Sequence, residues 1–117
     1  MDTFDVVFYP GQSDPTGQAL ENFGEKDETL REIMETEIWE LANANSLSAT
    51  YVIHVGGQLW CLHGRHKDLW GFMFFAKMDS NEVTMLNGYT RRLRKLPKLS
   101  AGQIRKARYL LEGLAHA

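Results

Sequence analysis

The chain has 117 residues, of which 44% are hydrophobic and 24% are charged, and this composition excludes an intrinsically disordered protein. Its length suits a single domain over residues 1–117. The longest apolar run, residues 69–76, is shorter than the about 20 residues of a membrane-spanning helix, and the acidic start lacks the basic segment of a signal peptide. We therefore expect a cytoplasmic protein with no membrane partner, and the single cysteine, Cys61, fits a reducing compartment.

Charge is strongly sorted along the chain. Residues 1–50 contain eleven acidic and two basic side chains, a net charge of −9, whereas residues 51–117 contain eleven basic and four acidic ones, a net charge of +7. The overall charge of −2 hides a two-signed molecule whose basic half is suited to a polyanion.

A strand and two helices are predicted in the acidic half. Residues 4–9 are rich in aromatic and β-branched side chains and end at a Pro-Gly turn, which predicts a strand. Asp14 can cap a short helix over residues 15–23, with proline at its first position. Between residues 27 and 44, apolar residues recur every three or four positions while Glu28, Glu32 and Glu35 lie elsewhere, which predicts an amphipathic helix.

The second half of the chain changes to β-type patterning. Turn residues, among them Gly64 and the Asp-Ser-Asn of residues 79–81, separate four short apolar segments. These segments are residues 50–55, 58–63, 69–76 and 82–87, and they predict an antiparallel meander. Ser100 and Gln103 form a capping box that opens a last helix. This order of elements predicts an α+β domain with helices on one face of a twisted antiparallel sheet.

A basic run after the last predicted strand is the strongest candidate for a binding site. Tyr89 precedes its five cations, which are Arg91, Arg92, Arg94, Lys95 and Lys98. Arginines beside an aromatic ring suit single-stranded nucleic acid, because guanidinium groups pair with phosphates and bases stack on rings. A solvated loop without a binding role would have the same composition.

A second cluster follows the predicted strand over residues 58–63 and comprises Cys61, His63, Arg65, His66 and Lys67. Side chains alternate along a strand, so Cys61 and His63 share one face, opposite the face that we expect to be the core. The spacing of the cysteine and histidines matches no recognised zinc pattern, so we predict neither a metal nor another cofactor.

Three stretches of the chain follow one another in a recognisable order. They are residues 59–63 (Leu-Trp-Cys-Leu-His), residues 69–75 (Leu-Trp-Gly-Phe-Met-Phe-Phe) and residues 83–97 (Val-Thr-Met-Leu-Asn-Gly-Tyr-Thr-Arg-Arg-Leu-Arg-Lys-Leu-Pro). In this order they resemble the HigB branch of the RelE toxin superfamily, the small phage-derived and plasmid-associated toxins of type II toxin–antitoxin systems. The resemblance covers nearly the whole chain and implies a single RelE-like domain with N-terminal helices and one C-terminal helix.

The resemblance also carries site residues over to this chain. Tyr89 takes the position of the family's Phe, the pair Arg91-Arg92 takes that of its paired lysines, and Lys95 or Arg94 takes that of its later lysine. In the central strands the chain departs from the family: Cys61 stands where Glu is usual, and His63 and Gly71 stand where Arg is usual.

The resemblance implies a metal-independent endoribonuclease that cleaves mRNA, commonly on the ribosome, and that a helix-turn-helix antitoxin neutralises. Such cleavage needs a base for the attacking 2′-hydroxyl, an acid for the leaving 5′-oxygen and fixed cations around the phosphate. The candidate catalytic residues are His63, His66, Tyr89, Arg91 and Arg92, and the candidate RNA-binding residues are Arg65, Lys67, Arg94, Lys95 and Lys98. Because two arginines of the family are replaced, the alternative is a non-catalytic RelE-fold protein that binds RNA or an antitoxin.

Overall fold

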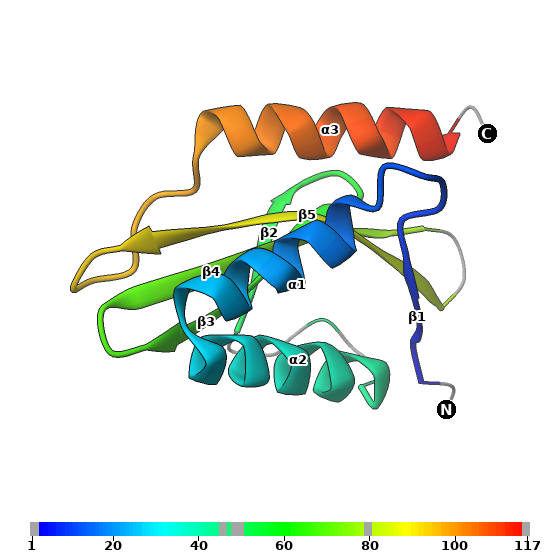
Figure 1. The fold of residues 1–117 in the computed structure, drawn as a ribbon. Coiled ribbons are helices and arrows are strands. Elements are labelled where there is room, and N and C mark those ends of the chain that lie inside the picture. The colour runs from blue at the N-terminus through cyan, green and yellow to red at the C-terminus, as the bar shows by residue number, and fades with distance from the viewer. Residues whose placement is uncertain (1–2, 45–46, 48–50, 79–80, 116–117) are drawn as a thin grey trace.

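The computed structural model describes residues 3–44, 47, 51–78 and 81–115, and within them three helices pack on a five-stranded sheet (Figure 1). The strands are β1 (Asp5–Phe8), β2 (Val52–Gly56), β3 (Leu59–His66), β4 (Leu69–Lys77) and β5 (Glu82–Arg92), and the helices are α1 (Pro15–Lys26), α2 (Glu28–Ala42) and α3 (Ala101–Ala115). The predicted α+β class is confirmed. None of the described helices is both long and apolar enough to cross a membrane. Thr50, Asp79 and Ser80 of the predicted strand and turn lie outside the described residues.

The sheet has the strand order β1-β5-β4-β3-β2. The four later strands form the predicted antiparallel meander, but β1 lies parallel to β5, with Asp5 beside Glu82 and Phe8 beside Met85, so the sheet is mixed. The chain between β1 and β5 contains both N-terminal helices and the strands β2, β3 and β4, and parallel neighbours need such a long connection. β5 continues through Arg92, five residues past its predicted end, because it pairs with β4 as far as Leu69.

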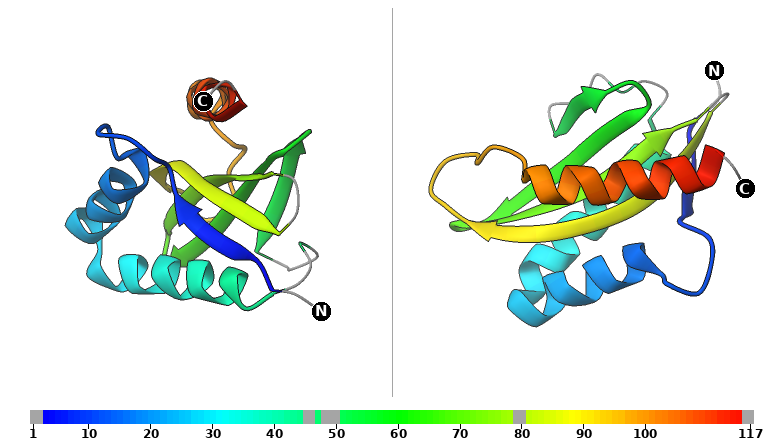
Figure 2. Two further views of the ribbon diagram at one scale, coloured as in Figure 1. Left: turned by 90° about the vertical axis from the view of Figure 1, so that its right-hand side faces the viewer. Right: turned by 90° about the horizontal axis from the view of Figure 1, so that it is seen from above.

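Helices cover both faces of the sheet, and the expectation that they pack on one face was wrong (Figure 2). One core lies between the sheet and α1 and α2, and it includes Leu62 and Met73. A second core lies between the sheet and α3, and it includes Cys61 and Phe74. Residues 69–76 of β4 are all buried, and a strand that is apolar on both sides needs cover on both sides.

A β-bulge in β5 helps to hold α3 on the sheet. The pairing of β4 with β5 shifts between Met73 and Phe75, and Asn87 then reaches α3. Its amide Nδ2 donates to the backbone oxygen of Gln103 at 3.2 Å and to Oε1 of the same residue at 3.0 Å. One half of the predicted capping box is present, because Ser100 Oγ accepts from the Gln103 N–H at 3.3 Å.

Asp27 joins the two N-terminal helices. Its N–H donates to the Phe23 oxygen at the end of α1, and its Oδ1 accepts from the N–H groups of Thr29 and Leu30 at the start of α2. Its other carboxylate oxygen accepts from Nδ1 of His66 at 2.7 Å. The hydrogen bond from His66, together with those from the backbone, holds the Asp27 pKa below its usual value.

Two glycines on neighbouring strands let α2 approach the sheet closely. Gly64 and Gly71 are cross-strand partners whose missing side chains would point at the buried Met34 of α2. A Cβ on Gly64 would lie 2.9 Å from Met34 Sδ and 3.0 Å from Ile33 Cγ2, closer than carbon atoms tolerate. Gly71 therefore faces α2, where a Cβ would lie 3.1 Å from Met34.

We predict that Gly64→Ala destabilises the fold by about 1–3 kcal/mol, because the added methyl group overpacks the contact with α2. Urea denaturation followed by circular dichroism measures the change. Gly102→Ala is the matched control, since nothing lies within 3.8 Å of a Cβ there and alanine favours a helix. Equal stability of Gly64→Ala and the native protein would contradict this account of the packing.

Candidate functional site

Three strands carry two rows of cross-strand neighbours on the α3 face of the sheet, next to the row that contains Cys61 and Phe74. The row nearer the β3–β4 turn is Arg65, Trp70 and Arg91, and the next row is His63, Phe72 and Tyr89. Four predicted site residues are thus brought to one face, with Arg65 and His63 on β3 and Tyr89 and Arg91 on β5. Adjacent strands lie about 4.8 Å apart, so the two halves of this set are about 10 Å apart.

Tyr89 anchors the start of α3. Its ring stacks on Phe72, with ring centroids 4.8 Å apart and planes at 18°, and its hydroxyl accepts a hydrogen bond from the Ser100 N–H at 2.9 Å. Burial raises the pKa of Tyr89 above its usual value of 10.0. The Tyr89 hydroxyl accepts a hydrogen bond from a backbone N–H and has a raised pKa. It is therefore better suited to holding α3 than to donating a proton in catalysis.

Arg65 and Trp70 hold the loop that follows β5. The Arg65 guanidinium lies over the Trp70 ring, 5.2 Å from its centroid, and donates to the Arg94 oxygen at 3.3 Å. The Trp70 indole N–H donates to the Leu93 oxygen at 2.8 Å. Arg91, at the far end of the same row, is exposed and has no ion-pair partner among the residues that the structure describes.

His63 opens into a cleft at the edge of the sheet. The cleft has a volume of about 320 Å³ and is lined by Ile33, Glu37, Tyr51, His63, Gly64, Arg65 and Trp70. It forms where β2 begins, between α2, the start of β2 and the end of β3. The ring of Tyr51 meets that of His63 edge-on, with centroids 6.3 Å apart.

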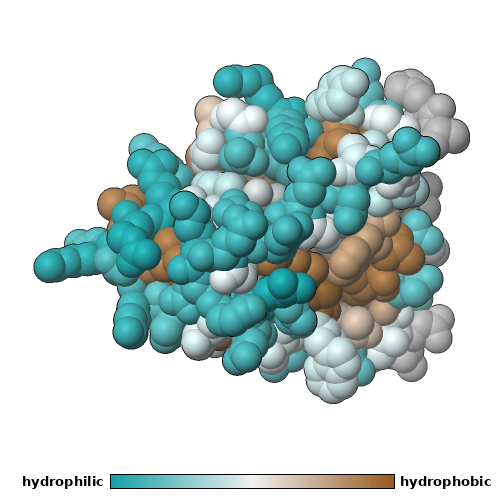
Figure 3. Space-filling view, in the orientation of Figure 1, coloured by the Kyte–Doolittle hydropathy of each residue, from teal (hydrophilic) through white to brown (hydrophobic). Residues whose placement is uncertain are grey.

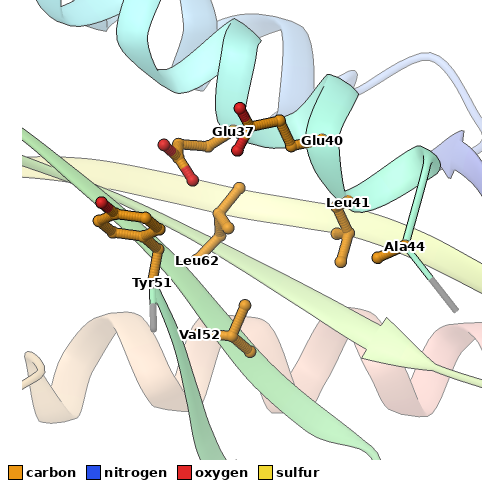
Figure 4. A pocket seen from close by; sticks show the side chains of 7 residues that line it. All are labelled: Glu37, Glu40, Leu41, Ala44, Tyr51, Val52 and Leu62. Carbon is orange, nitrogen blue, oxygen red and sulfur yellow. The ribbon is translucent and has the colours of Figure 1, made fainter. Parts of the chain in front are cut away.

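The cleft brings a carboxyl group and an imidazole together under partial burial. Burial lowers the pKa of His63 below 6.5, because the charged imidazolium loses water. Burial raises the pKa of Glu37 above 4.5, and the nearby carboxylate of Glu40 raises it further. A second cleft of about 180 Å³ adjoins the first, and Figure 4 shows Glu37 extending from α2 on the same side as Tyr51. The two ionisable groups therefore have pKa values closer together than in water.

The other predicted catalytic residues lie away from this cleft. His66 is on the α2 face of β3, where it binds Asp27. Arg92 is on the same face of β5 and forms an ion pair with Asp68. The structure therefore does not bring either residue together with His63.

The remaining predicted RNA-binding residues surround the end of the sheet. Lys67 is exposed in the β3–β4 turn, and the loop between β5 and α3 carries Arg94, Lys95 and Lys98, all exposed. Cys61, in contrast, is fully buried under α3, and burial raises its pKa to about 12, so its thiol is unreactive.

Sequence reasoning missed Glu37 and Tyr51. A signal for Glu37 was present, because it follows Met34 by three residues and precedes Leu41 by four and so lies on the buried stripe of α2. A carboxyl group on a buried stripe is a candidate for a functional residue. No comparable pattern marks Tyr51, whose position depends on the chain entering β2.

Comparisons with known proteins assign no family. No protein-family model matches the chain, and no curated protein matches it. In the described part of the chain, no group of three or more His, Cys, Asp or Glu side chains is placed to hold a metal ion.

We expect Tyr89→Phe to lower the free energy of unfolding by about 1 kcal/mol, because the Ser100 N–H loses its acceptor while the ring stacking is kept. Chemical denaturation measures the change. Tyr109→Phe is the control, since Tyr109 is 77% exposed on α3. If Tyr89→Phe were as stable as the native protein, the hydroxyl would have no anchoring role.

Proposed function

We propose that this protein is a metal-independent endoribonuclease that cleaves mRNA in the cleft between α2 and β3. The observation that carries the proposal is that one cleft holds a carboxyl group (Glu37), an imidazole (His63) and a guanidinium (Arg65). These are the three kinds of group that RNA transesterification needs: two that exchange protons and one that stabilises the charged phosphate.

The reaction divides among these side chains as follows. The 2′-hydroxyl gives its proton to a base and attacks the neighbouring phosphorus, the bond from phosphorus to the 5′-oxygen breaks, and an acid protonates that oxygen. The products are a 2′,3′-cyclic phosphate and a 5′-hydroxyl end. Glu37 is the base and the protonated His63 is the acid, while Arg65 pairs with the phosphoryl oxygens.

Single-stranded RNA is the substrate that suits the surroundings of the cleft. A volume of about 320 Å³ is at the small end of ligand sites and suits one nucleotide. Arg91 lies about two strand spacings from the β3 residues of the cleft, so only a longer strand contacts both. The exposed cations of the following loop extend this positive surface.

The partners follow from the resemblance to the HigB branch. We propose that cleavage acts on mRNA at the ribosome and that a helix-turn-helix antitoxin neutralises the protein. A non-catalytic RNA-binding protein is the second candidate. Three of the predicted catalytic side chains already have partners within the protein, and this favours the second candidate. The pairs are His66 with Asp27, Arg92 with Asp68, and the Tyr89 hydroxyl with the Ser100 N–H.

We predict that His63→Gln and Glu37→Gln each lower the rate of mRNA cleavage by about 10²- to 10⁴-fold, because each removes a proton-transfer group. The assay follows a defined mRNA with and without ribosomes, and RNA affinity is measured separately. His66→Gln is the matched control and should cleave at nearly the native rate, since His66 is not among the residues that line the cleft and its ring is paired with Asp27. In a bacterial host, induction of the native protein should slow growth, whereas induction of a variant that carries both His63→Gln and Glu37→Gln should not.

The same assay has an expected pH dependence. Activity requires Glu37 to be ionised and His63 to be protonated, so kcat/KM should rise as pH passes the Glu37 pKa, above 4.5, and fall as it passes the His63 pKa, below 6.5. The maximum should therefore lie on the acidic side of neutral pH. If the mRNA stayed intact at every pH while the protein still bound RNA, the nuclease proposal would be rejected. The result would support the non-catalytic RNA-binding protein instead.

We also predict that Arg91→Gln weakens RNA binding and reduces the slope of log K against log salt by about 0.7, the contribution of one phosphate contact on a single strand. Arg92→Gln, whose guanidinium is already paired with Asp68, should leave the slope unchanged. Titration of a short RNA at several salt concentrations measures both. Equal slopes for the native protein and Arg91→Gln would show that this face does not contact RNA.

A further inference from the structure

An apolar groove lies at the opposite edge of the sheet from the cleft. Its volume is about 320 Å³, and it is lined by Val6, Phe8, Leu20, Glu35, Ile38, Trp39 and Ala42. Two of its large side chains are unusually open to water, because Phe8 is 46% and Trp39 is 68% exposed. Figure 3 shows hydrophobic surface over β1 and the neighbouring end of α2. Exposed aromatic side chains around an apolar groove indicate a binding surface.

The groove runs beside an open strand edge. β1 is the outermost strand, and no other strand of the described chain pairs with its outer side. The N–H groups of Asp5 and Tyr9 donate to Asn81 and Met85 at 2.9 and 3.0 Å on the β5 side. Hydrogen-bonding groups alternate in direction along a strand, so those of Val6 and Phe8 face outward. The Phe4 N–H on this outer side already donates to the Ala44 oxygen at 3.0 Å, so the part of β1 that is placed to pair with an added strand is Val6–Phe8.

The elements that form the groove belong to the acidic half of the chain. Glu35 lines it and pairs with Arg31 at 2.7 Å, and the pKa of Arg31 is raised by Glu35 first and then by Glu28 and Glu21. Glu35 is the carboxylate that lines the groove, and β1, α1 and α2 around it belong to residues 1–50, whose net charge is −9. A second copy of this chain pairing through the same edge would bring like charges together, whereas a basic segment would neutralise them.

We propose that β1 and this groove bind an extended, basic segment of a partner protein, which adds to the sheet as a further strand. Its backbone pairs with Val6 and Phe8, alternate apolar side chains fill the groove beside Trp39, and its lysines or arginines face the carboxylates of α2. The groove lies at the β1 edge and the cleft at the β3 side, so the partner leaves the cleft open. This inference does not depend on RNA cleavage.

The test uses a labelled, capped nine-residue peptide of alternating lysine and valine, titrated by fluorescence anisotropy into the full-length protein. We expect Trp39→Ala to weaken binding at least tenfold, because the apolar side chains lose their main contact while every charge is kept. Tyr109→Ala, an exposed aromatic residue on the other side of the sheet, is the control and should bind as the native protein does. The same peptide with glutamate for lysine should not bind.

Strand addition has its own readout, since hydrogen exchange at the Val6 and Phe8 amides should slow when the basic peptide binds. Equal affinity for the native protein and Trp39→Ala would overturn the proposal, because the peptide would then bind by charge alone. Binding of the acidic peptide would overturn the proposal that the groove selects a basic segment. Concentration-dependent dimerisation that Trp39→Ala abolishes, seen by analytical ultracentrifugation, would assign the groove to a second copy and also overturn it.

Discussion

The strand β4 imposes the main constraint on this structure, because residues 69–76 are buried along their whole length. A strand that is apolar on both sides is stable only between two covering layers. The two N-terminal helices supply one layer and α3 supplies the other. The central position of β4 in the sheet, between β5 and β3, follows from the same need, since edge strands stay partly exposed to water.

On the α3 face, the ends of two neighbouring cross-strand rows stay open to water. α3 covers the sheet over the row that contains Cys61 and Phe74, and it begins where Tyr89 meets Ser100. The two neighbouring rows have Phe72 and Trp70 at their centres and polar side chains at their ends. The loop between β5 and α3 is held beside them by hydrogen bonds from Arg65 and Trp70. The ring of Tyr89 thus serves the fold, while His63 and Arg91 on the same face remain available for binding and chemistry.

The cleft and the groove lie toward opposite sides of the sheet and differ in what α2 contributes to them. At the β3 side, Gly64 lets α2 come close enough for Glu37 to share a cleft with His63, and partial burial moves their pKa values toward each other. At the β1 edge, the same helix presents Trp39 and Glu35 beside an unpaired strand. One helix therefore places an ionisable group at one surface and an apolar anchor with an acidic border at the other.

The sequence by itself determined the α+β class, the meander, the two N-terminal helices and the capped start of α3, because periodicity, turn residues and caps act over a few neighbouring positions. It also indicated that Cys61 and His63 share a face, since side chains alternate along a strand. Only the tertiary structure decided that β1 lies parallel to β5, that α3 packs on the opposite face, and that His66 and Arg92 turn away from His63 toward Asp27 and Asp68. Those outcomes depend on contacts between residues far apart in the chain, as does the lining of one cleft by Glu37 and His63, and no local pattern encodes such contacts.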